Sequence, residues 1–117
     1  MTIATVSIER RGALPVVHVR GEIDFPNADA VRTDVFGTMP IDGPGLILDL
    51  TQTTYLDSSS IRMLFEVAEH LQASHQRLLL VVTEEALIRR VIVLTKLDDV
   101  MTLVATVDEA LTILRST

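Results

Sequence analysis

The residues of this chain whose types and spacing best fit chemistry are three consecutive serines behind an aspartate, Asp57-Ser58-Ser59-Ser60. They follow an apolar run at 46–50 and a polar stretch, so we expect a buried strand to lead there by a loop into a helix. Ligand sites in open α/β sheets gather beyond the carboxyl ends of the strands. The free amide groups and partial positive charge of a helix amino terminus stabilise an anion, so a phosphate on Ser58 would be tolerated there.

Such a phosphate would add about −1.5 to −2 charge and considerable bulk to an exposed surface. That change is enough to alter a docking interface without unfolding the domain. The alternative is structural, because Asp and Ser are preferred helix caps, worth roughly 0.5 to 2 kcal/mol each. Taken without their context, the four residues fit simple capping better than regulatory phosphorylation.

The serines do not form a known nucleophile motif. A hydrolase elbow has glycine two residues on either side of its serine, whereas Ser58 has Leu56 and Ser60 at those positions. The sequence also lacks a phosphate-binding loop of the type Gly-x-x-x-x-Gly-Lys-Ser/Thr. We therefore expect no enzyme activity and no cofactor.

The three histidines do not have metal-ligand spacing. His70 and His75 are five residues apart, not the four that place a metal pair on one helix face, and His18 lies in a strand pattern. The chain contains no cysteine, which excludes thiolate ligands and disulfides. We expect solvated or packing histidines and no bound metal.

The composition is that of one acidic domain. With 48% hydrophobic residues, the 117-residue chain is expected to form a single domain over residues 1–117. The net charge of −6 repels nucleic acid and anionic lipid, and 3% aromatic residues leave few surfaces for stacking bases. No segment has the length of a membrane span or the pattern of an export signal. A cytoplasmic protein with a protein partner, and with no nucleic-acid or membrane partner, is therefore expected.

The first half of the chain alternates strand and helix patterns. Two short strands at about residues 5–10 and 15–19 form a hairpin, and residues 21–27 are rich in turn formers. Asp24 or Asn27 then caps a helix, and residues 38–45 form a loop. The apolar run at 46–50 is typical of a strand covered on both faces. Two helices are predicted from apolar residues at helical spacing. The first contains Ala28, Val31 and Val35, and the second, which follows the serines, contains Ile61, Leu64, Phe65, Ala68 and Leu71.

The second half continues the alternation. A strand at 78–82 precedes a helix with Leu87, Ile88, Val91 and Leu94, and a weak strand at 100–104 precedes a helix that has the capping-box spacing of Thr106 and Glu109. This order predicts an α/β fold in which about four helices pack on a mixed sheet of about five strands, with right-handed crossovers.

Four ordered segments resemble the landmarks of STAS domains of the bacterial anti-sigma factor antagonist (anti-anti-sigma factor) type, and they span most of the chain. The resemblance implies that an anti-sigma factor that is also a serine kinase phosphorylates Ser58. The unphosphorylated protein would bind this kinase and release a sigma factor for transcription, and a serine phosphatase would restore it. The segments are Gly21-Glu22-Ile23-Asp24, Leu48-Asp49-Leu50, Leu56-Asp57-Ser58-Ser59 and Leu94-Thr95-Lys96-Leu97-Asp98.

The same resemblance indicates the partner-binding surface. The loop at residue 24 would lie beside the phosphorylation site, and the start of the following helix would dock the kinase. The expected set is Asp24, Phe25, Asp57, Ser58, Ser59, Ser60, Ile61 and Met63.

Two residues depart from the family pattern, Ser60 and Lys96, each at a position where the family usually has glycine. A side chain at Ser60 is expected to narrow a partner's approach. Lys96 is expected to adopt a positive φ, at a cost of the order of 1 kcal/mol. These departures leave open a second hypothesis, in which the chain is a non-switching STAS adaptor or scaffold subunit in a stress-signalling or lipid-transport complex. In that case Ser58 would act only as a helix cap.

Overall fold

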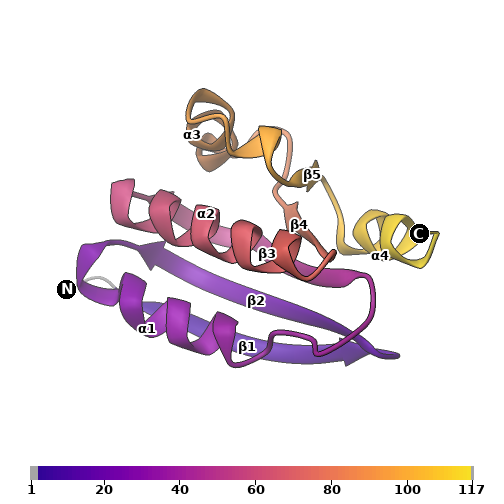
Figure 1. The fold of residues 1–117 in the computed structure, drawn as a ribbon. Helices are drawn as coiled ribbons and strands as arrows, with labels where there is room; N and C mark the ends of the chain where they lie inside the picture. Colours follow the sequence, from indigo (N-terminus) through magenta and orange to yellow (C-terminus); the bar gives the residue numbers. More distant parts are fainter. Residues whose placement is uncertain (1–2, 117) are drawn as a thin grey trace.

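The structure, a computed structural model, describes residues 3–116 and contains one five-stranded sheet (Figure 1). Its strands lie in chain order, and only the first pair is antiparallel, so the sheet is mixed. The strands are β1 (Ala4–Arg11), β2 (Leu14–Ile23), β3 (Gly45–Leu56), β4 (Arg77–Val81) and β5 (Thr102–Val104).

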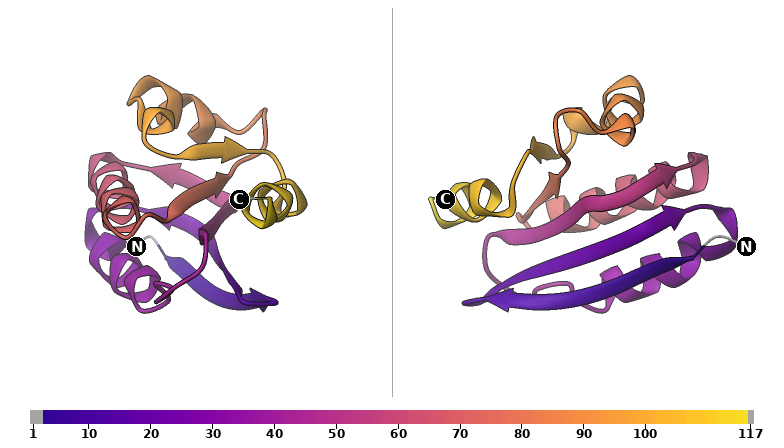
Figure 2. Two further views of the ribbon diagram at one scale, coloured as in Figure 1. Left: turned by 45° about the vertical axis from the view of Figure 1, so that its right-hand side comes forward. Right: turned by 180° about the vertical axis from the view of Figure 1, so that it is seen from behind.

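Four α-helices cover the two faces unequally (Figure 2). The helices α1 (Phe25–Phe36), α2 (Ser58–Ala73) and α3 (Leu87–Leu94) pack on one face. Among the helices of residues 3–116, only α4 (Val107–Arg115) packs on the other face, while a 3-10 turn, η1 (Leu97–Asp99), leads into β5. These elements confirm the predicted α/β fold with its mixed sheet.

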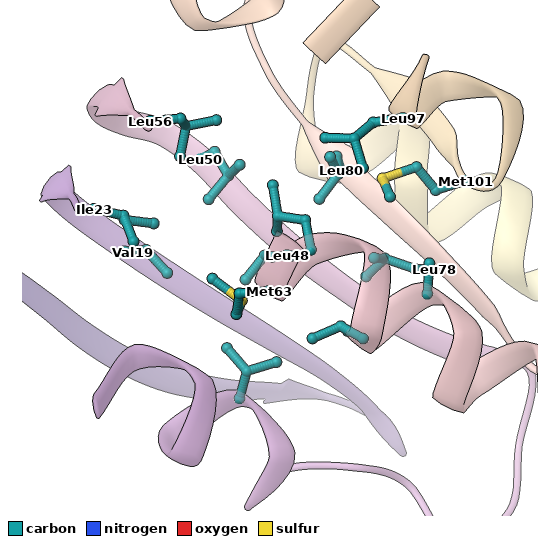
Figure 3. Packing of buried hydrophobic residues seen from close by; sticks show 14 of the residues in the cluster. Val19, Ile23, Leu48, Leu50, Leu56, Met63, Leu78, Leu80, Leu97 and Met101 are labelled. Atoms are coloured by element: carbon teal, nitrogen blue, oxygen red, sulfur yellow. The ribbon is translucent and has the colours of Figure 1, made fainter. Parts of the chain in front are cut away.

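The core is built on the apolar run of β3. Leu46, Leu48 and Leu50 face the α1, α2 and α3 side and are almost fully buried, as Figure 3 shows for Leu48 and Leu50. Ile47 points to the opposite face and packs with Leu111 of α4. Because both faces of this segment are covered, the strand is continuously apolar rather than alternating.

The strands β2 and β3 run further than the sequence predicts. Residues 21–23, expected in a turn, belong to β2, and residues 51–56, expected in a polar loop, belong to β3. Beyond Leu50 the face opposite to α2 has no helix over it, and Gln52, Thr54 and Tyr55 are exposed while Thr53 and Leu56 remain buried. Gly21 is not a turn residue: it lies at a register shift with φ +106, and a Cβ there would collide with the carbonyl oxygen of Ile3.

The helix α3 also differs from its predicted pattern. Ile88 and Ile92 face the core, whereas Leu87 and Leu94 are 78% and 75% exposed. A helix of eight residues at the margin of the sheet buries only a narrow stripe, so the broader predicted face was wrong. Lys96 has φ 62, which confirms the left-handed conformation expected there.

None of the helices formed by residues 3–116 combines the length and the apolar character needed to cross a membrane.

We predict that Leu64→Ala destabilises the protein by about 2 to 5 kcal/mol, because the Leu64 side chain is fully buried in α2. Leu94→Ala is the matched control: it removes the same atoms from a largely exposed position and should change stability by less than about 0.5 kcal/mol. Urea unfolding of both variants measures the difference. Equal losses would contradict this description of the core.

Candidate functional site

The candidate site lies where β2 and β3 end side by side. Ile23 is in register with Leu56, so the next residues, Asp24 and Asp57, lie at the same edge of the sheet. Each aspartate has an extended backbone and is the N-cap of the helix that follows, α1 and α2 respectively. The loop at residue 24 and the serines are therefore neighbours, as the resemblance to STAS domains implied.

The Asp57 carboxylate connects the two helices. One oxygen, Oδ1, accepts a hydrogen bond from the backbone amide of Ser60 at 3.0 Å. The other, Oδ2, accepts from the backbone amide of Phe25 at 2.8 Å. One side chain thus satisfies a free amide at the start of α2 and another at the start of α1, groups that a helix cannot pair internally.

These bonds set the protonation state of Asp57. Partial burial acts to raise its pKa, but the hydrogen bonds from Ser60 and from the amide of Phe25 outweigh it and hold the pKa below its ordinary value. The carboxylate is therefore ionised at neutral pH.

Ser60 lies inside the molecule and not on its surface. Its side chain is fully buried, and its hydroxyl donates to the carbonyl oxygen of Ile23 and accepts from the amide of Asp57 at 3.1 Å. The expectation that Ser60 narrows a partner's approach was therefore wrong. Its hydroxyl completes a capping box and joins α2 to the end of β2.

Ser58 and Ser59 occupy the first two positions of α2. Ser58 is exposed and Ser59 is half-buried. The caps are Asp57 and Ser60, so the interpretation of Ser58 as the helix cap was wrong. The Ser58 hydroxyl therefore stands at a helix start whose capping bonds come from its neighbours.

The surface around Ser58 is narrower than predicted. The Phe25 side chain is 71% exposed, and it lines a hollow of 170 Å³ between α1 and α2 together with Ser59 and Arg62. Ile61 and Met63 are buried in the core, and Figure 3 shows Met63 among the core side chains. Their side chains face the sheet, so these two expected docking residues contribute to packing instead.

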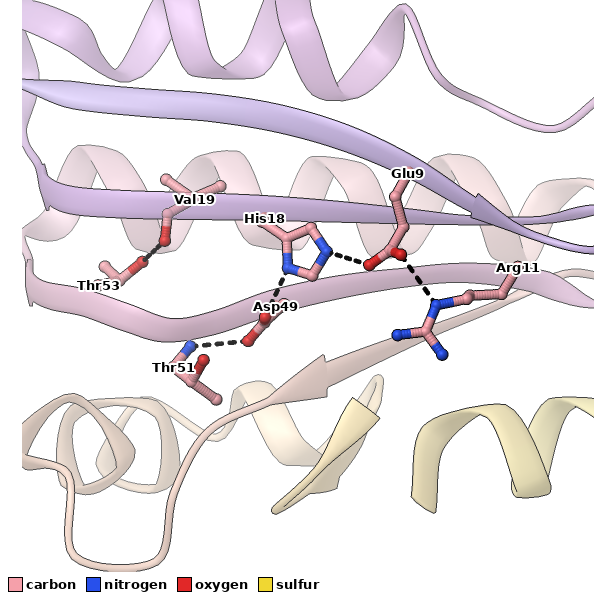
Figure 4. A network of polar contacts seen from close by, with 7 residues as sticks. All are labelled: Glu9, Arg11, His18, Val19, Asp49, Thr51 and Thr53. Atoms are coloured by element: carbon pink, nitrogen blue, oxygen red, sulfur yellow. Dashed lines mark hydrogen bonds and ion pairs between the residues drawn. The ribbon is translucent and has the colours of Figure 1, made fainter. Parts of the chain in front are cut away.

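The structure also contains a polar network that the sequence did not predict (Figure 4). The ring of His18 on β2 lies between two carboxylates: Nδ1 is 2.6 Å from Asp49 Oδ2 on β3, and Nε2 is 2.6 Å from Glu9 Oε1 on β1. Strand alternation places His18 on the face opposite to the buried Val17 and Val19, but only the register across three strands shows which acids meet it.

The network raises the pKa of His18. Partial burial alone would lower it, but the hydrogen bonds to Glu9 and Asp49 outweigh that effect. Ser7 is the register partner of His18, yet both ring nitrogens already face carboxylates, so the ring has no free nitrogen to deprotonate a serine. The arrangement therefore does not form a nucleophile–base pair. Within residues 3–116, no group of three or more acidic or histidine side chains could hold a metal ion.

Comparison with known proteins agrees with the fold. The family model of the STAS domain matches residues 5–110. The crystal structure of an anti-sigma factor antagonist from Mycobacterium paratuberculosis is 32% identical, with a TM-score of 0.86 over 97% of this chain and 95% of that one. The chain belongs to the STAS domain family.

More distant structures share the same fold. The anti-sigma factor antagonist SpoIIAA in its unphosphorylated form is 20% identical, with a TM-score of 0.76 over 97% of this chain and 98% of that one. The phosphorylated form of SpoIIAA, a cell fate determinant of Bacillus, is 18% identical, with a TM-score of 0.66 over 92% and 97%. A search of the curated proteins found no match.

We predict that Asp57→Ala lowers stability by about 1 to 3 kcal/mol at pH 7, because two backbone amides lose their acceptor. The pKa of Asp57 is lower in the folded chain, so its contribution is complete above the unfolded value of about 3.9 and is lost as the pH falls through the folded pKa. The gap between the natural protein and the variant should therefore narrow on acidification.

Urea unfolding at a series of pH values measures this gap. Asp34→Ala, which removes an exposed acid from α1, is the control and should change stability by less than about 0.5 kcal/mol. A loss for Asp57→Ala that stays constant down to the lowest pH would contradict the role given to its charge.

Proposed function

We propose that this protein is an anti-sigma factor antagonist that binds an anti-sigma factor serine kinase and is controlled by phosphorylation of Ser58. The observation that carries the proposal is the exposed Ser58 hydroxyl at the first position of α2, beside caps supplied by Asp57 and Ser60. Removing or modifying Ser58 leaves those caps in place. The hydroxyl is thus available for chemistry that the rest of the site does not need for folding.

A phosphate at this position would act on the surface. The amide groups of the helix start favour an anion, so the added charge does not oppose the fold of α2. The same charge would lie next to the ionised Asp57 and close to Asp24, and would make the docking surface strongly negative. A partner that fits the unphosphorylated surface would then be repelled.

Phe25 supplies the apolar part of the proposed docking surface. Its backbone amide is held by Asp57, and its largely exposed ring lines a hollow with Ser59, so the ring is available as an aromatic anchor for a partner. The kinase would bring the phosphoryl-transfer groups, because this chain offers the acceptor and its support. Binding of the kinase would release its sigma factor, and a serine phosphatase would restore the unmodified protein.

The non-switching adaptor loses one of its two supports. Ser60 was a reason to doubt a kinase's approach to Ser58, and its side chain points into the molecule. The left-handed Lys96 lies between α3 and η1, outside the residues of the docking surface. The binding experiment below therefore distinguishes the adaptor hypothesis from the switch.

We predict that a kinase partner binds the natural protein and Ser58→Ala with similar affinity and binds Ser58→Asp at least about tenfold more weakly, because a negative charge at this position repels it. Pull-downs from a lysate of the source organism identify the partner, and binding is then measured with the purified pair. With ATP, the purified partner should phosphorylate the natural protein at Ser58, as detected by mass spectrometry.

Ser59→Ala is the matched control, because it removes a neighbouring hydroxyl without adding charge, and it should preserve phosphorylation at Ser58. Phe25→Ala should weaken binding while leaving the unfolding curve unchanged, because its ring is largely exposed. Equal recovery of one partner by all baits, with no phosphate at Ser58, would exclude the switch and favour the adaptor.

A further inference from the structure

The network around His18 lies on the face of the sheet opposite to α1 and α2, away from the docking surface. A carboxylate oxygen can only accept a hydrogen bond, so two carboxylates at 2.6 Å require both ring nitrogens to donate. A ring that donates twice is an imidazolium. The observed geometry is therefore that of the protonated ring, which bridges three neighbouring strands.

The two carboxylates differ in how firmly they are held. Asp49 has a side chain that is only 11% exposed, and its Oδ1 also accepts from the amide of Thr51 at 2.9 Å. Glu9 lies on the edge strand β1 with a side chain that is 40% exposed, and its Oε2 is 2.9 Å from Nε of Arg11. A buried carboxylate loses more than an exposed one when its donor is removed.

A neutral ring has one N–H and can keep only one of these bonds. The less exposed Asp49 retains its bond, which fixes the proton on Nδ1, and the lone pair on Nε2 then faces Glu9. Glu9 can turn away because water and Arg11 satisfy its oxygens. Deprotonation therefore breaks the hydrogen bond between the ring and Glu9 of β1 and leaves the bond to Asp49 of β3 in place.

We propose that His18 is a proton-operated latch that ties the edge strand β1 to the sheet through Glu9 and releases Glu9 when the ring loses its proton. The backbone ladder between β1 and β2 remains, so release loosens the edge strand without unfolding it. A hollow of 370 Å³ beside the ring, lined among others by Ser7 and Gln52, opens this site to water and gives the proton a route.

The charged groups near the ring come from four elements. Glu9 and Arg11 lie on β1, Arg20 lines the same hollow from β2, and Asp49 belongs to β3. Asp108 of α4 acts on Arg11 from beyond it.

The carboxylates in direct contact with the ring determine the pH range of the latch. They raise the pKa of His18 above its ordinary value of about 6.5. The bond to Glu9 thus stabilises the fold fully below that value and is lost as the pH rises through the raised pKa.

Nuclear magnetic resonance tests the latch. We expect the ¹⁵N shifts of the His18 ring to titrate above about 6.5 and the neutral ring to be the Nδ1–H tautomer, which is not the form favoured by free histidine. Across this titration, hydrogen-exchange protection of the β1 amides, corrected for the intrinsic pH dependence, should fall roughly two- to fivefold.

Two substitutions test separately the hydrogen bonds of the His18 ring to Glu9 and to Asp49. In Glu9→Gln the side-chain amide can donate to the neutral Nε2, so β1 protection should lose its pH dependence while the ring stays Nδ1–H. In Asp49→Asn the neutral ring should change to Nε2–H and donate to Glu9. If Asp49→Asn does not fold, Glu9→Gln decides the test, because its side chain lies at an exposed edge.

A His18 titration at or below about 6.5, a neutral Nε2–H ring in the natural protein, or equal β1 protection on both sides of the titration would each overturn the latch.

Discussion

The Asp57 carboxylate holds together the segments on which this site depends. It accepts from the first turn of its own helix through Ser60 and from the first turn of α1 through Phe25. The buried Ser60 hydroxyl adds a bond to Ile23 at the end of β2. Two strand ends and two helix starts therefore share one set of hydrogen bonds, and neither helix can shift without leaving a polar group unpaired.

This arrangement separates support from chemistry. The Asp57 carboxylate connects the starts of α1 and α2, and the buried Ser60 hydroxyl is bonded to the end of β2. Ser58 and Phe25 are exposed beside this hydrogen-bonded backbone. On the proposed function, a phosphate on Ser58 would change what the surface binds without changing the fold beneath it. The opposite face of the sheet is also divided, because α4 covers one end and leaves the polar cluster around His18 open at the other.

Sequence patterns were sufficient to locate a helix or strand where the pattern lies within that one element. The helical repeat of Ile61, Leu64 and Leu71 located α2, and the apolar run at 46–50 located the centre of β3. The left-handed backbone at Lys96 was expected from the resemblance to STAS domains. Patterns failed where a residue's environment comes from a distant segment. The length of β3 depends on which face α4 leaves open, the inward position of Ser60 depends on the Ile23 carbonyl, and the His18 network depends on the register of three strands.

The central claim is that phosphate on Ser58 alters the surface and leaves the Asp57 connection intact. The most direct measurement is nuclear magnetic resonance of the full chain with phosphoserine incorporated at position 58, compared with the unmodified protein. We expect amide shift changes confined to the neighbourhood of residues 24–25 and 57–62, with the amides of Phe25 and Ser60 still protected from hydrogen exchange. Loss of protection at those two amides, or shift changes that extend through β2 and β3, would contradict the account.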